Sequence, residues 1–227
     1  EKEQSKVNLE KSGLIKKMWD IMSETYEDNT DLMTLQSNIT LYNLTRCKQA
    51  RTICEVGVGP GCGPRLFAAN FMKPGTAMYC SDISPQMIKA FEESFNRSCL
   101  DKSKVSLTVL DESEHVPVSS TPDDTRSLFV TVANNEKLPY PDESFDVYIS
   151  NLCLMLVDNH VNMLEEAYRV LQPGGYAGFT IVGREENCEF WKVIPHALSK
   201  VGIEFPKPPR SQYYLSDIDT LKSSLES

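Results

Sequence analysis

The sequence predicts an α/β fold: a doubly wound, mostly parallel sheet with helices on both faces, preceded by a helical extension. Short apolar runs alternate with stretches of helical periodicity from residue 51 onward, which is typical of parallel strands joined by covering helices. Glycines occupy alternate positions in ICEVGVGPGCGP, residues 53–64, directly after the first apolar run. An acid, Asp82, ends the second run.

The first strands and helices are expected to follow one another closely. TICEVGV, residues 52–58, reads as a buried strand, and residues 64–72 as the helix after it. TAMYCSDI, residues 76–83, reads as the second strand. Ser84 can cap a helix that has Pro85 at its first position and runs to about Arg97.

Three more strands are expected at 127–134, 144–156 and 176–183, with a helix at 162–171 before the last of them. The connection formed by residues 98–127 is far longer than the usual ~2–6 residues. Because it contains the run VSLTVL, we expect an insertion with an extra strand and a mobile loop.

Helical spacing of apolar side chains over residues 7–47 predicts two or three N-terminal helices. We therefore expect a helical lid or extension at 1–47 and the main domain at 48–227. In the C-terminal part we expect a helix at 190–201, a weak strand at 202–205 and a short helix at 216–225.

The composition narrows the classes of function. The chain has 227 residues, 41% of them hydrophobic, and a formal net charge of −9, which argues against a nucleic-acid partner. No run reaches the ~18 apolar residues of a membrane span, and no signal peptide is visible. Together with the cysteine pattern described next, these features lead us to expect a cytoplasmic protein.

The seven cysteines form no C-x-x-C pair, and several lie in apolar runs. Reduced core thiols fit this pattern better than a disulfide framework. The three histidines, His115, His160 and His196, form no ligand-spaced cluster with the cysteines, so no metal site is expected.

The glycine run and Asp82 together predict a nucleotide-like ligand. Glycines at a strand-to-helix turn permit positive φ and let a ligand lie against the backbone. Asp82 follows Gly61 by 21 positions (82 − 61), the spacing of an acid that binds ribose hydroxyls. A ligand-free turn, and a helix cap or exposed acid at Asp82, are the alternatives. Glu55 would repel a pyrophosphate and attract the ammonium and sulfonium of S-adenosylmethionine.

The segment EVGVGPG, residues 55–61, resembles the first motif of class I S-adenosylmethionine-dependent methyltransferases. Residues 134–146, 150–152 and 166–175 resemble, in order and spacing, later segments of the same enzymes. The resemblance spans residues 51–183 and points to the small-molecule branch, methyltransferase type 11, which includes ubiquinone and menaquinone biosynthesis enzymes. It implies a Rossmann-like fold and methyl transfer to a small molecule by in-line displacement.

The resemblance also implies roles for individual residues. The glycines would pass under the methionine part of the cofactor, and Glu55 would meet its ammonium directly or through water. Asp82 would bind the ribose, and Ile83 would lie against the adenine. The positions assigned to the cofactor are Glu55, Gly57, Gly59, Gly61, Asp82, Ile83, Asn134, Asn135, Glu136, Asn151 and Leu152.

Within that set, Asn134 stands where many relatives have Asp for the adenine amino group. Asn135 and Glu136 follow in the same loop, and the backbone amide of Asn135 is a candidate partner for an adenine ring nitrogen. Asn151 and Leu152 would close the site near the transferable methyl group.

No catalytic base is predicted. Many relatives have a His shortly after strand four, where this chain has Cys153-Leu154-Met155-Leu156, and Cys153 reads as a packed thiol. Trp19 and Tyr26 could cover the cofactor or simply pack on the sheet. An acceptor pocket is expected from aromatic and apolar residues near the mouth: Met155, Phe190, Trp191, Tyr213 and Tyr214.

Relatives usually end with two further strands, whereas only 44 residues (227 − 183) follow Gly183 here. We therefore expect an incomplete C-terminal part of the sheet, through truncation, an unusual end or a partner chain. The first alternative function is a non-catalytic subunit or binding module with this fold. A nicotinamide-dependent oxidoreductase and a protein or nucleic-acid methyltransferase are weaker alternatives. The acceptor and the oligomeric state are not predicted.

Overall fold

The computed structural model describes residues 2–119, 121, 124–189, 193, 196, 199–200, 202 and 211–226. The chain forms two compact units, Glu1–Thr180 and Ile181–Ser227. The boundary predicted after residue 47 falls inside the first unit, which contains the sheet. The second unit contains a short 3₁₀ helix, η2 (Glu185–Asn187), and α7 (Ile218–Glu226).

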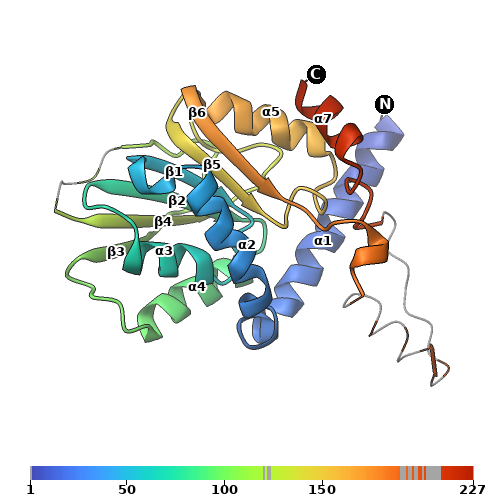
Figure 1. Ribbon diagram of the computed structural model, residues 1–227, viewed down its shortest axis with the longest axis horizontal. Helices are drawn as coiled ribbons and strands as arrows, with labels where there is room; N and C mark the ends of the chain where they lie inside the picture. The colour runs from blue at the N-terminus through green and yellow to red at the C-terminus, as the bar shows by residue number, and fades with distance from the viewer. Residues whose placement is uncertain are drawn as a thin grey trace. The chain divides into compact units, whose positions relative to one another are not determined.

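Strands and helices alternate in the first unit, after two helices at its beginning (Figure 1). Its elements are α1 (Lys2–Asn29), α2 (Asp31–Leu44), η1 (Cys47–Gln49), β1 (Thr52–Val56), α3 (Cys62–Asn70), β2 (Thr76–Asp82), α4 (Pro85–Arg97), β3 (Val105–Val109), β4 (Arg126–Val132), β5 (Phe145–Asn151), α5 (His160–Val170) and β6 (Leu171–Thr180).

The six strands pair in the order β3-β4-β2-β1-β5-β6, and every pairing is parallel. β1 pairs with β2 on one side and with β5 on the other, for example through Thr52↔Ala77 and Ile53↔Val147. The chain order therefore reverses at β1, which makes the carboxyl end of this strand the expected ligand position. The predicted doubly wound sheet is confirmed.

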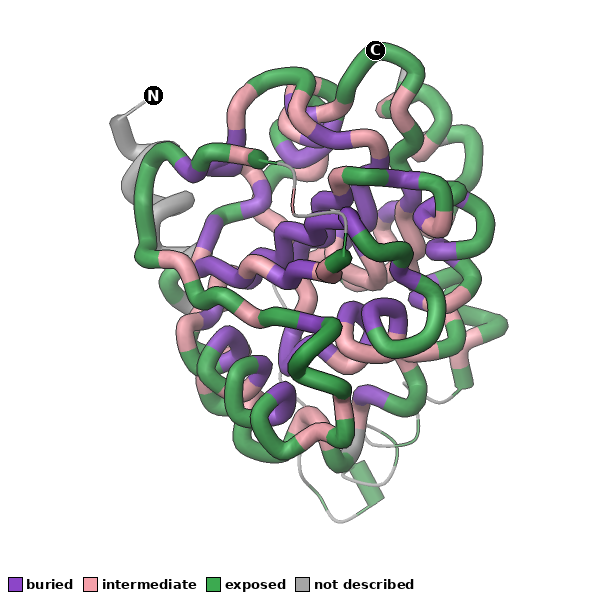
Figure 2. The backbone as a smooth tube through the Cα atoms, turned by 90° about the vertical axis from the view of Figure 1, so that its left-hand side faces the viewer, coloured by how far each residue is buried: buried purple, intermediate pink, exposed green. Residues whose placement is uncertain are grey.

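One face of the sheet is covered by α2, α3 and α4. Alternate strand residues such as Ile53, Met78 and Val147 form the main core there, together with Phe67 and Phe91 from the helices. Figure 2 shows the buried residues concentrated in the central strands and along the inner sides of the helices. Burial on both faces explains why the strands read as continuous apolar runs.

The other face carries an aromatic cluster in which Tyr79 stacks on Phe129 with ring centroids 4.7 Å apart. Tyr140 and Phe145 complete it with an edge contact at 5.2 Å. α5 is tied to this side because Arg169 Nη1 donates to the backbone oxygen of Tyr140 at 2.8 Å. Helices thus flank both faces, as predicted.

The long connection over residues 98–127 contributes to the same side. Its VSLTVL run forms β3, a parallel edge strand beside β4, which confirms the extra strand. After β3, Val116 is buried, and the Ser119 amide donates to the Tyr79 hydroxyl at 3.0 Å. Part of the predicted insertion therefore covers the aromatic cluster.

Several predicted boundaries were wrong by a few residues. α3 begins at Cys62 rather than 64, because Gly61 takes a left-handed conformation just before it. β5 ends at Asn151 rather than 156, because Leu152 has φ +53 and leaves the strand. β6 occupies Leu171–Thr180, so it begins before residue 176, where the strand was predicted to start. The register of its pairing with β5 shifts between Phe145 and Val147 of β5.

Helix starts follow the expected chemistry. Ser84 caps α4 by accepting from the Met87 amide at 3.1 Å, and Pro85 occupies the first turn. Most of the predicted 190–201 helix and of the 202–205 strand lies outside the described residues, whereas α7 matches the helix predicted at 216–225.

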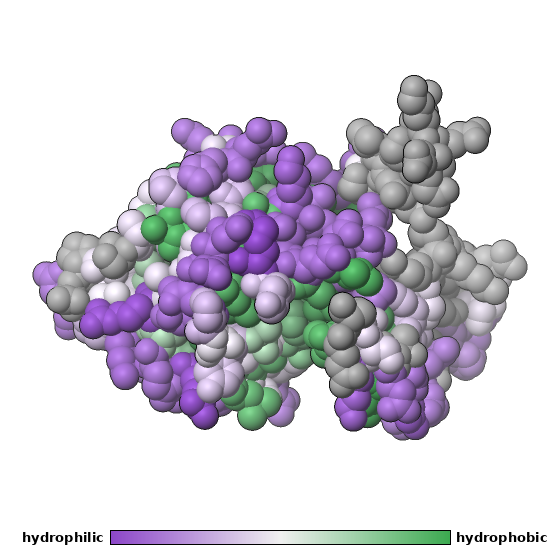
Figure 3. All heavy atoms as spheres, turned by 90° about the horizontal axis from the view of Figure 1, so that it is seen from above, coloured by the Kyte–Doolittle hydropathy of each residue, from purple (hydrophilic) through white to green (hydrophobic). Residues whose placement is uncertain are grey.

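Hydrophilic residues cover most of the face in Figure 3, with a smaller group of hydrophobic residues between them. Among the described residues, no helix is long and apolar enough to cross a membrane. Within the same residues there is no group of three or more His, Cys, Asp or Glu placed to hold a metal ion. All seven cysteines are free thiols.

Candidate ligand-binding site

A cavity that is partly open to solvent lies at the carboxyl ends of β1, β2 and β5. One side of it, here called the loop wall, is formed by Glu55, the glycine loop 57–59 and Asp82. The other side, the helix wall, is formed by residues of α1 and α2. Figure 1 shows α1 crossing this end of the sheet.

The glycine loop adopts a backbone that side chains would oppose. Gly57, Gly59 and Gly61 have φ values of +65, +55 and +77. A Cβ on Gly57 would lie 2.7 Å from Cys153 Sγ, and a Cβ on Gly61 would overlap the Phe91 ring. The first and third glycines are therefore required by packing as well as by conformation.

Asp82 fixes the same loop from β2. Its Oδ2 accepts from the Gly59 amide at 3.0 Å, and its Oδ1 accepts from the Ser84 amide at 2.9 Å. Burial raises the pKa of Asp82 to about 6, although the backbone hydrogen bonds from Ser84 and Gly59 oppose the shift. Asp82 thus lines the cavity and also orders the turn into α4.

Glu55 is only 1% exposed and is held by α2. Asn38 Nδ2 donates to its Oε1 at 3.0 Å, and the Tyr42 hydroxyl donates to its Oε2 at 2.6 Å. Burial raises the pKa of Glu55 to about 7, whereas the two hydrogen bonds lower it. A cation at this point would compensate a carboxylate that has left water.

The end of β5 contributes a polar junction with the helix wall. Asn151 Oδ1 accepts from Ser37 Oγ at 2.8 Å and from Thr180 Oγ1 at 2.6 Å, and its Nδ2 donates to the Thr34 backbone oxygen at 3.1 Å. The next residue, Leu152, has positive φ and also lines the cavity. Asn151 therefore positions α2 against the sheet.

Cys153 is a packed thiol rather than a nucleophile. Its Sγ accepts from Asn135 Nδ2 at 3.3 Å. Burial, with a smaller contribution from Asp82, raises its pKa to about 12, so the thiol stays neutral. The interpretation drawn from the sequence agrees with this geometry.

The helix wall contains Trp19 and Tyr26 of α1, and Tyr26 lies beside the glycine loop, with its ring 3.7 Å from where a Cβ on Gly59 would stand. The two rings meet edge to face with centroids 6.1 Å apart, and both line the cavity. Asp20, beside Trp19, accepts from Ser84 Oγ at 2.6 Å, which ties α1 to the start of α4.

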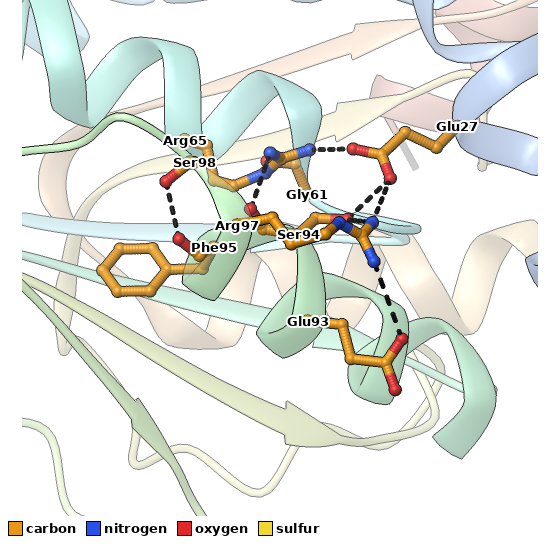
Figure 4. A network of polar contacts seen from close by, with 8 residues as sticks. All are labelled: Glu27, Gly61, Arg65, Glu93, Ser94, Phe95, Arg97 and Ser98. Carbon is orange, nitrogen blue, oxygen red and sulfur yellow. Dashed lines mark hydrogen bonds and ion pairs between the residues drawn. The ribbon is translucent and has the colours of Figure 1, made fainter.

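A second tie lies at Glu27, shown in Figure 4. Glu27 pairs with Arg65 of α3 at 3.0 Å and with Arg97 of α4 at 2.8 Å, and it accepts from Ser94 Oγ at 2.8 Å. Burial raises the pKa of Glu27, but the hydrogen bonds from Ser94 and Arg65 outweigh it and hold this pKa below its ordinary value. Arg65 also donates to the Gly61 backbone oxygen, so the tie reaches the glycine loop.

Most predicted cofactor residues line this cavity: Glu55, Gly57, Gly59, Asp82, Ile83, Asn135, Asn151 and Leu152, as do Trp19 and Tyr26 of the predicted substrate set. Gly61, Asn134, Glu136 and Met155 do not belong to the lining. Asn134 accepts from the Glu136 amide, and Glu136 accepts from the amides of Asp158 and Asn159, so these two side chains order their own loops. Trp191 lies outside the described residues.

The sequence did not predict that α2 contributes to the cavity lining. Asp31, Thr34, Leu35 and Asn38 line the cavity at the i, i+3, i+4, i+7 spacing of one helix face. Cys62, Gly63, Met87 and Leu156 were also not predicted. Polar residues on one face of a helix that is expected to cover the sheet could have indicated that α2 lines the site. The hydrogen bonds of Asn38 and Tyr42 to Glu55 could not be predicted, because they depend on the tertiary fold.

The cavity is suited to a ligand that is rich in hydrogen-bond donors and positive charge. Its lining contains Asp31, Glu55 and Asp82, and no Lys, Arg or His among the described residues. Among the residues that line the cavity, three buried acceptor atoms have no partner within the described part of the chain: Asp31 Oδ2, Asn38 Oδ1 and Asn135 Oδ1. Buried polar atoms normally have partners, which makes these three atoms candidate ligand contacts.

Comparison with known proteins shows which family this chain resembles. A family model described as a methyltransferase domain matches residues 55–179. Over 166 residues the chain is 26% identical to the demethylmenaquinone methyltransferase of Tropheryma whipplei, covering 71% of this chain and 56% of that protein. It is 39% identical over 131 residues to an uncharacterized protein of Methanocaldococcus jannaschii, covering 58% of this chain and 44% of that one. The matches thus span about half of each relative's length.

Solved structures show the same fold. A Methanococcus maripaludis protein assigned as an S-adenosyl-L-methionine-dependent methyltransferase aligns with a TM-score of 0.58 and 15% identity, over 93% of this chain and 83% of that one. A phosphoethanolamine N-methyltransferase of Haemonchus contortus, solved with S-adenosylhomocysteine, aligns with a TM-score of 0.51 and 18% identity, over 84% and 36%. With the family model covering more than half of its length, this chain belongs to the methyltransferase domain family, in the class I, type 11 branch.

Proposed function

We propose that this chain binds S-adenosyl-L-methionine and transfers its methyl group to a small-molecule acceptor. The observation that carries the proposal is a single cavity that joins Glu55, Gly57, Gly59 and Asp82 and offers acceptors without a basic side chain. A ligand with an ammonium, a sulfonium, ribose hydroxyls and an adenine amino group matches this lining in charge and in hydrogen-bonding capacity.

The residue assignments follow from these positions. Glu55 and the free Oδ1 of Asn38 would receive the ammonium, and Asp82 would receive ribose hydroxyls beside Ile83. The free Oδ1 of Asn135 would accept from a donor on the adenine side. Gly61 would support the site through packing against Phe91 rather than through contact. Asn134 and Glu136 would act indirectly, by ordering the loop that carries Asn135.

When bound, the cofactor supplies a methyl group on an activated sulfonium leaving group. The chain then contributes orientation and exclusion of water, which is where most of the acceleration of an in-line displacement can come from. α1, with Trp19 and Tyr26 in the helix wall, would act as the lid that excludes water. We assign no catalytic base within the proposed function itself.

Isothermal titration tests the proposal, with S-adenosylmethionine, S-adenosylhomocysteine and NAD as titrants. We expect the first two to bind and NAD not to bind. Asp82→Asn should weaken the binding of both adenosyl compounds by about tenfold, because the ribose loses a charged hydrogen-bond acceptor. Asp111→Asn, an exposed acid in the segment after β3, is the matched control and should bind like the wild type.

Binding of NAD in preference to the adenosyl compounds would contradict the proposal in favour of an oxidoreductase. Binding of S-adenosylmethionine without turnover to S-adenosylhomocysteine across a panel of acceptors would favour the non-catalytic module instead. Circular dichroism of Asp82→Asn separates lost ligand contacts from lost folding, since Asp82 also orders the glycine loop.

A further inference from the structure

Three carboxylates line the cavity, and they differ in how the protein satisfies them. Glu55 accepts from Asn38 and Tyr42, and Asp82 accepts from two backbone amides. The third, Asp31, is 6% exposed, and its Oδ2 has no hydrogen-bond partner among the described residues. Among the acids of this cavity, Asp31 is therefore the one with a buried carboxylate oxygen that no group in the described part of the chain hydrogen-bonds.

The surroundings of Asp31 do not neutralise it. Burial raises its pKa to about 6; Arg65 of α3 lowers it, and Glu27 of α1 adds to the rise. Arg65 is already engaged by Glu27 and by the backbone oxygens of Gly61 and Ser94. Asp31 is thus largely ionised near pH 7.5, and burying such a charge is costly unless a cation completes it.

Asp31 also stands apart from the point assigned to the cofactor ammonium. It precedes Asn38 by seven residues on one face of α2, which corresponds to about 10 Å along the helix axis. Asn38 is bonded to Glu55, whereas Asp31 lies at the start of α2, where its charge helps to raise the pKa of Tyr26. The cavity therefore has a second centre of negative charge on the helix wall.

We propose that Asp31 forms an acceptor subsite, with Tyr26 and Thr34 beside it, for a small molecule whose methylated atom is a basic amine nitrogen. This inference rests on the proposed methyl transfer and deepens it by naming the class of acceptor. Asp31 binds the ammonium form of the acceptor through its free oxygen, in a charge-assisted hydrogen bond.

The chemistry favours a carboxylate on the acceptor side. The bound ammonium gives one proton to the Asp31 carboxylate and becomes a neutral amine. The amine lone pair then forms the N–CH₃ bond as the S–CH₃ bond breaks, and the electron pair of that bond remains on sulfur. Positive charge thus moves from sulfur to nitrogen, and the proton held by Asp31 passes to solvent, which restores a carboxylate beside the cationic product.

The test uses sinefungin, in which an amine-bearing carbon replaces the methyl-bearing sulfur of S-adenosylmethionine. Its amine occupies the point that the acceptor nitrogen approaches, whereas S-adenosylhomocysteine has no charge there. Binding of both compounds is measured by titration calorimetry to wild type, Asp31→Asn and Asp28→Asn. Asp28 is an exposed acid three residues before Asp31, outside the cavity lining, and serves as the matched control.

We expect Asp31→Asn to weaken the binding of sinefungin by about tenfold and the binding of S-adenosylhomocysteine by less than about twofold. Asp28→Asn should change neither affinity. Equal losses for the two compounds in Asp31→Asn, or no loss for either, would overturn the inference. If S-adenosylhomocysteine does not bind the wild type, the proposed function itself fails and this inference fails with it. Circular dichroism confirms that each variant is folded.

Discussion

The two walls of the cavity are held by different kinds of interaction. The loop wall is fixed by backbone amides bonded to Asp82 and by Phe91 packed where Gly61 has no side chain. The helix wall is fixed by side chains: Glu27 with Arg65 and Arg97, and Asp20 with Ser84. We therefore expect that disturbing the loop wall unpacks the core, whereas disturbing the helix wall releases α1 and leaves the sheet intact.

This difference has an expected functional consequence. Glu55 and Asp82 are 1% and 7% exposed, and the helix wall faces them across the cavity that they line. Partly exposed ion pairs contribute little to stability, which suits a segment that must open and close. We therefore expect α1 to act as the moving part and the loop wall as the fixed part.

The largest expected effect comes from changing Gly61, which closely follows the loop wall in the chain and abuts the Phe91 ring. Gly61→Ala forces a side chain into a left-handed conformation and against the Phe91 ring, and we expect a loss of about 3 kcal/mol or more in unfolding free energy. Urea denaturation measures it. Gly174→Ala is the matched control, since Gly174 has φ +85 with open space around it and should cost about 1 kcal/mol.

Equal losses in the two glycine variants would show that backbone strain alone accounts for the effect. In that case the packing of Phe91 would not be what fixes the loop wall, and the contrast between the two walls would need revision.

The second-largest effect is expected from the hydrogen bond between Tyr42 of α2 and Glu55 of the loop wall. Tyr42→Phe removes the hydroxyl that α2 donates to buried Glu55, and we expect a loss of about 2 kcal/mol and weaker binding of S-adenosylhomocysteine. Tyr148→Phe is the control, because Tyr148 is equally buried but its hydroxyl has no partner among the described residues. That change should cost less than about 0.5 kcal/mol. Similar melting curves for the two variants would argue against a structural role of the Tyr42–Glu55 bond.

The smallest effect on stability is expected in the helix wall. Glu27→Gln removes the charge that pairs with Arg65 and Arg97, and it should change the unfolding free energy by less than about 1 kcal/mol. It should nevertheless raise the dissociation rate of S-adenosylhomocysteine about threefold, because α1 opens more often. Stopped-flow fluorescence of Trp19 can follow the release.

Glu93→Gln serves as the control for that experiment. Glu93 carries the same charge on α4, and its ion pairs are with Lys89 at 3.9 Å and Arg97 at 4.0 Å, both on α4 itself. An equal increase in dissociation rate in both variants would mean that general electrostatics, rather than the Glu27 tie, controls the lid.

Local sequence patterns were enough to predict the conformation of the loop wall. The alternating glycines, Asp82 at the end of a strand and the Ser84-Pro85 cap are encoded within short segments, and the positive φ values and the cap bear them out. The boundaries of α3, β5 and β6 escaped prediction because they depend on single residues, such as Gly61 and Leu152, that leave regular conformation.

Most residues of the helix wall could not be predicted from the sequence. Trp19 and Tyr26 were candidates, but Asp31 and Asn38 were not, because an acid and an amide on a helix usually face water. Their burial results from α2 packing against β5 and β6 and from the bonds that Asn38 and Tyr42 make to Glu55. These partners lie 17 and 13 residues apart in the chain.

Local periodicity and short motifs were enough to predict the α/β class, the order of strands and helices, the family and the glycine loop. Three features could be seen only in the folded chain: which acids in the cavity have hydrogen-bond partners, which glycine meets the core rather than the cavity, and how α1 and α2 pack over the sheet. Those outcomes depend on contacts between distant segments, whose geometry is set only when the whole core packs.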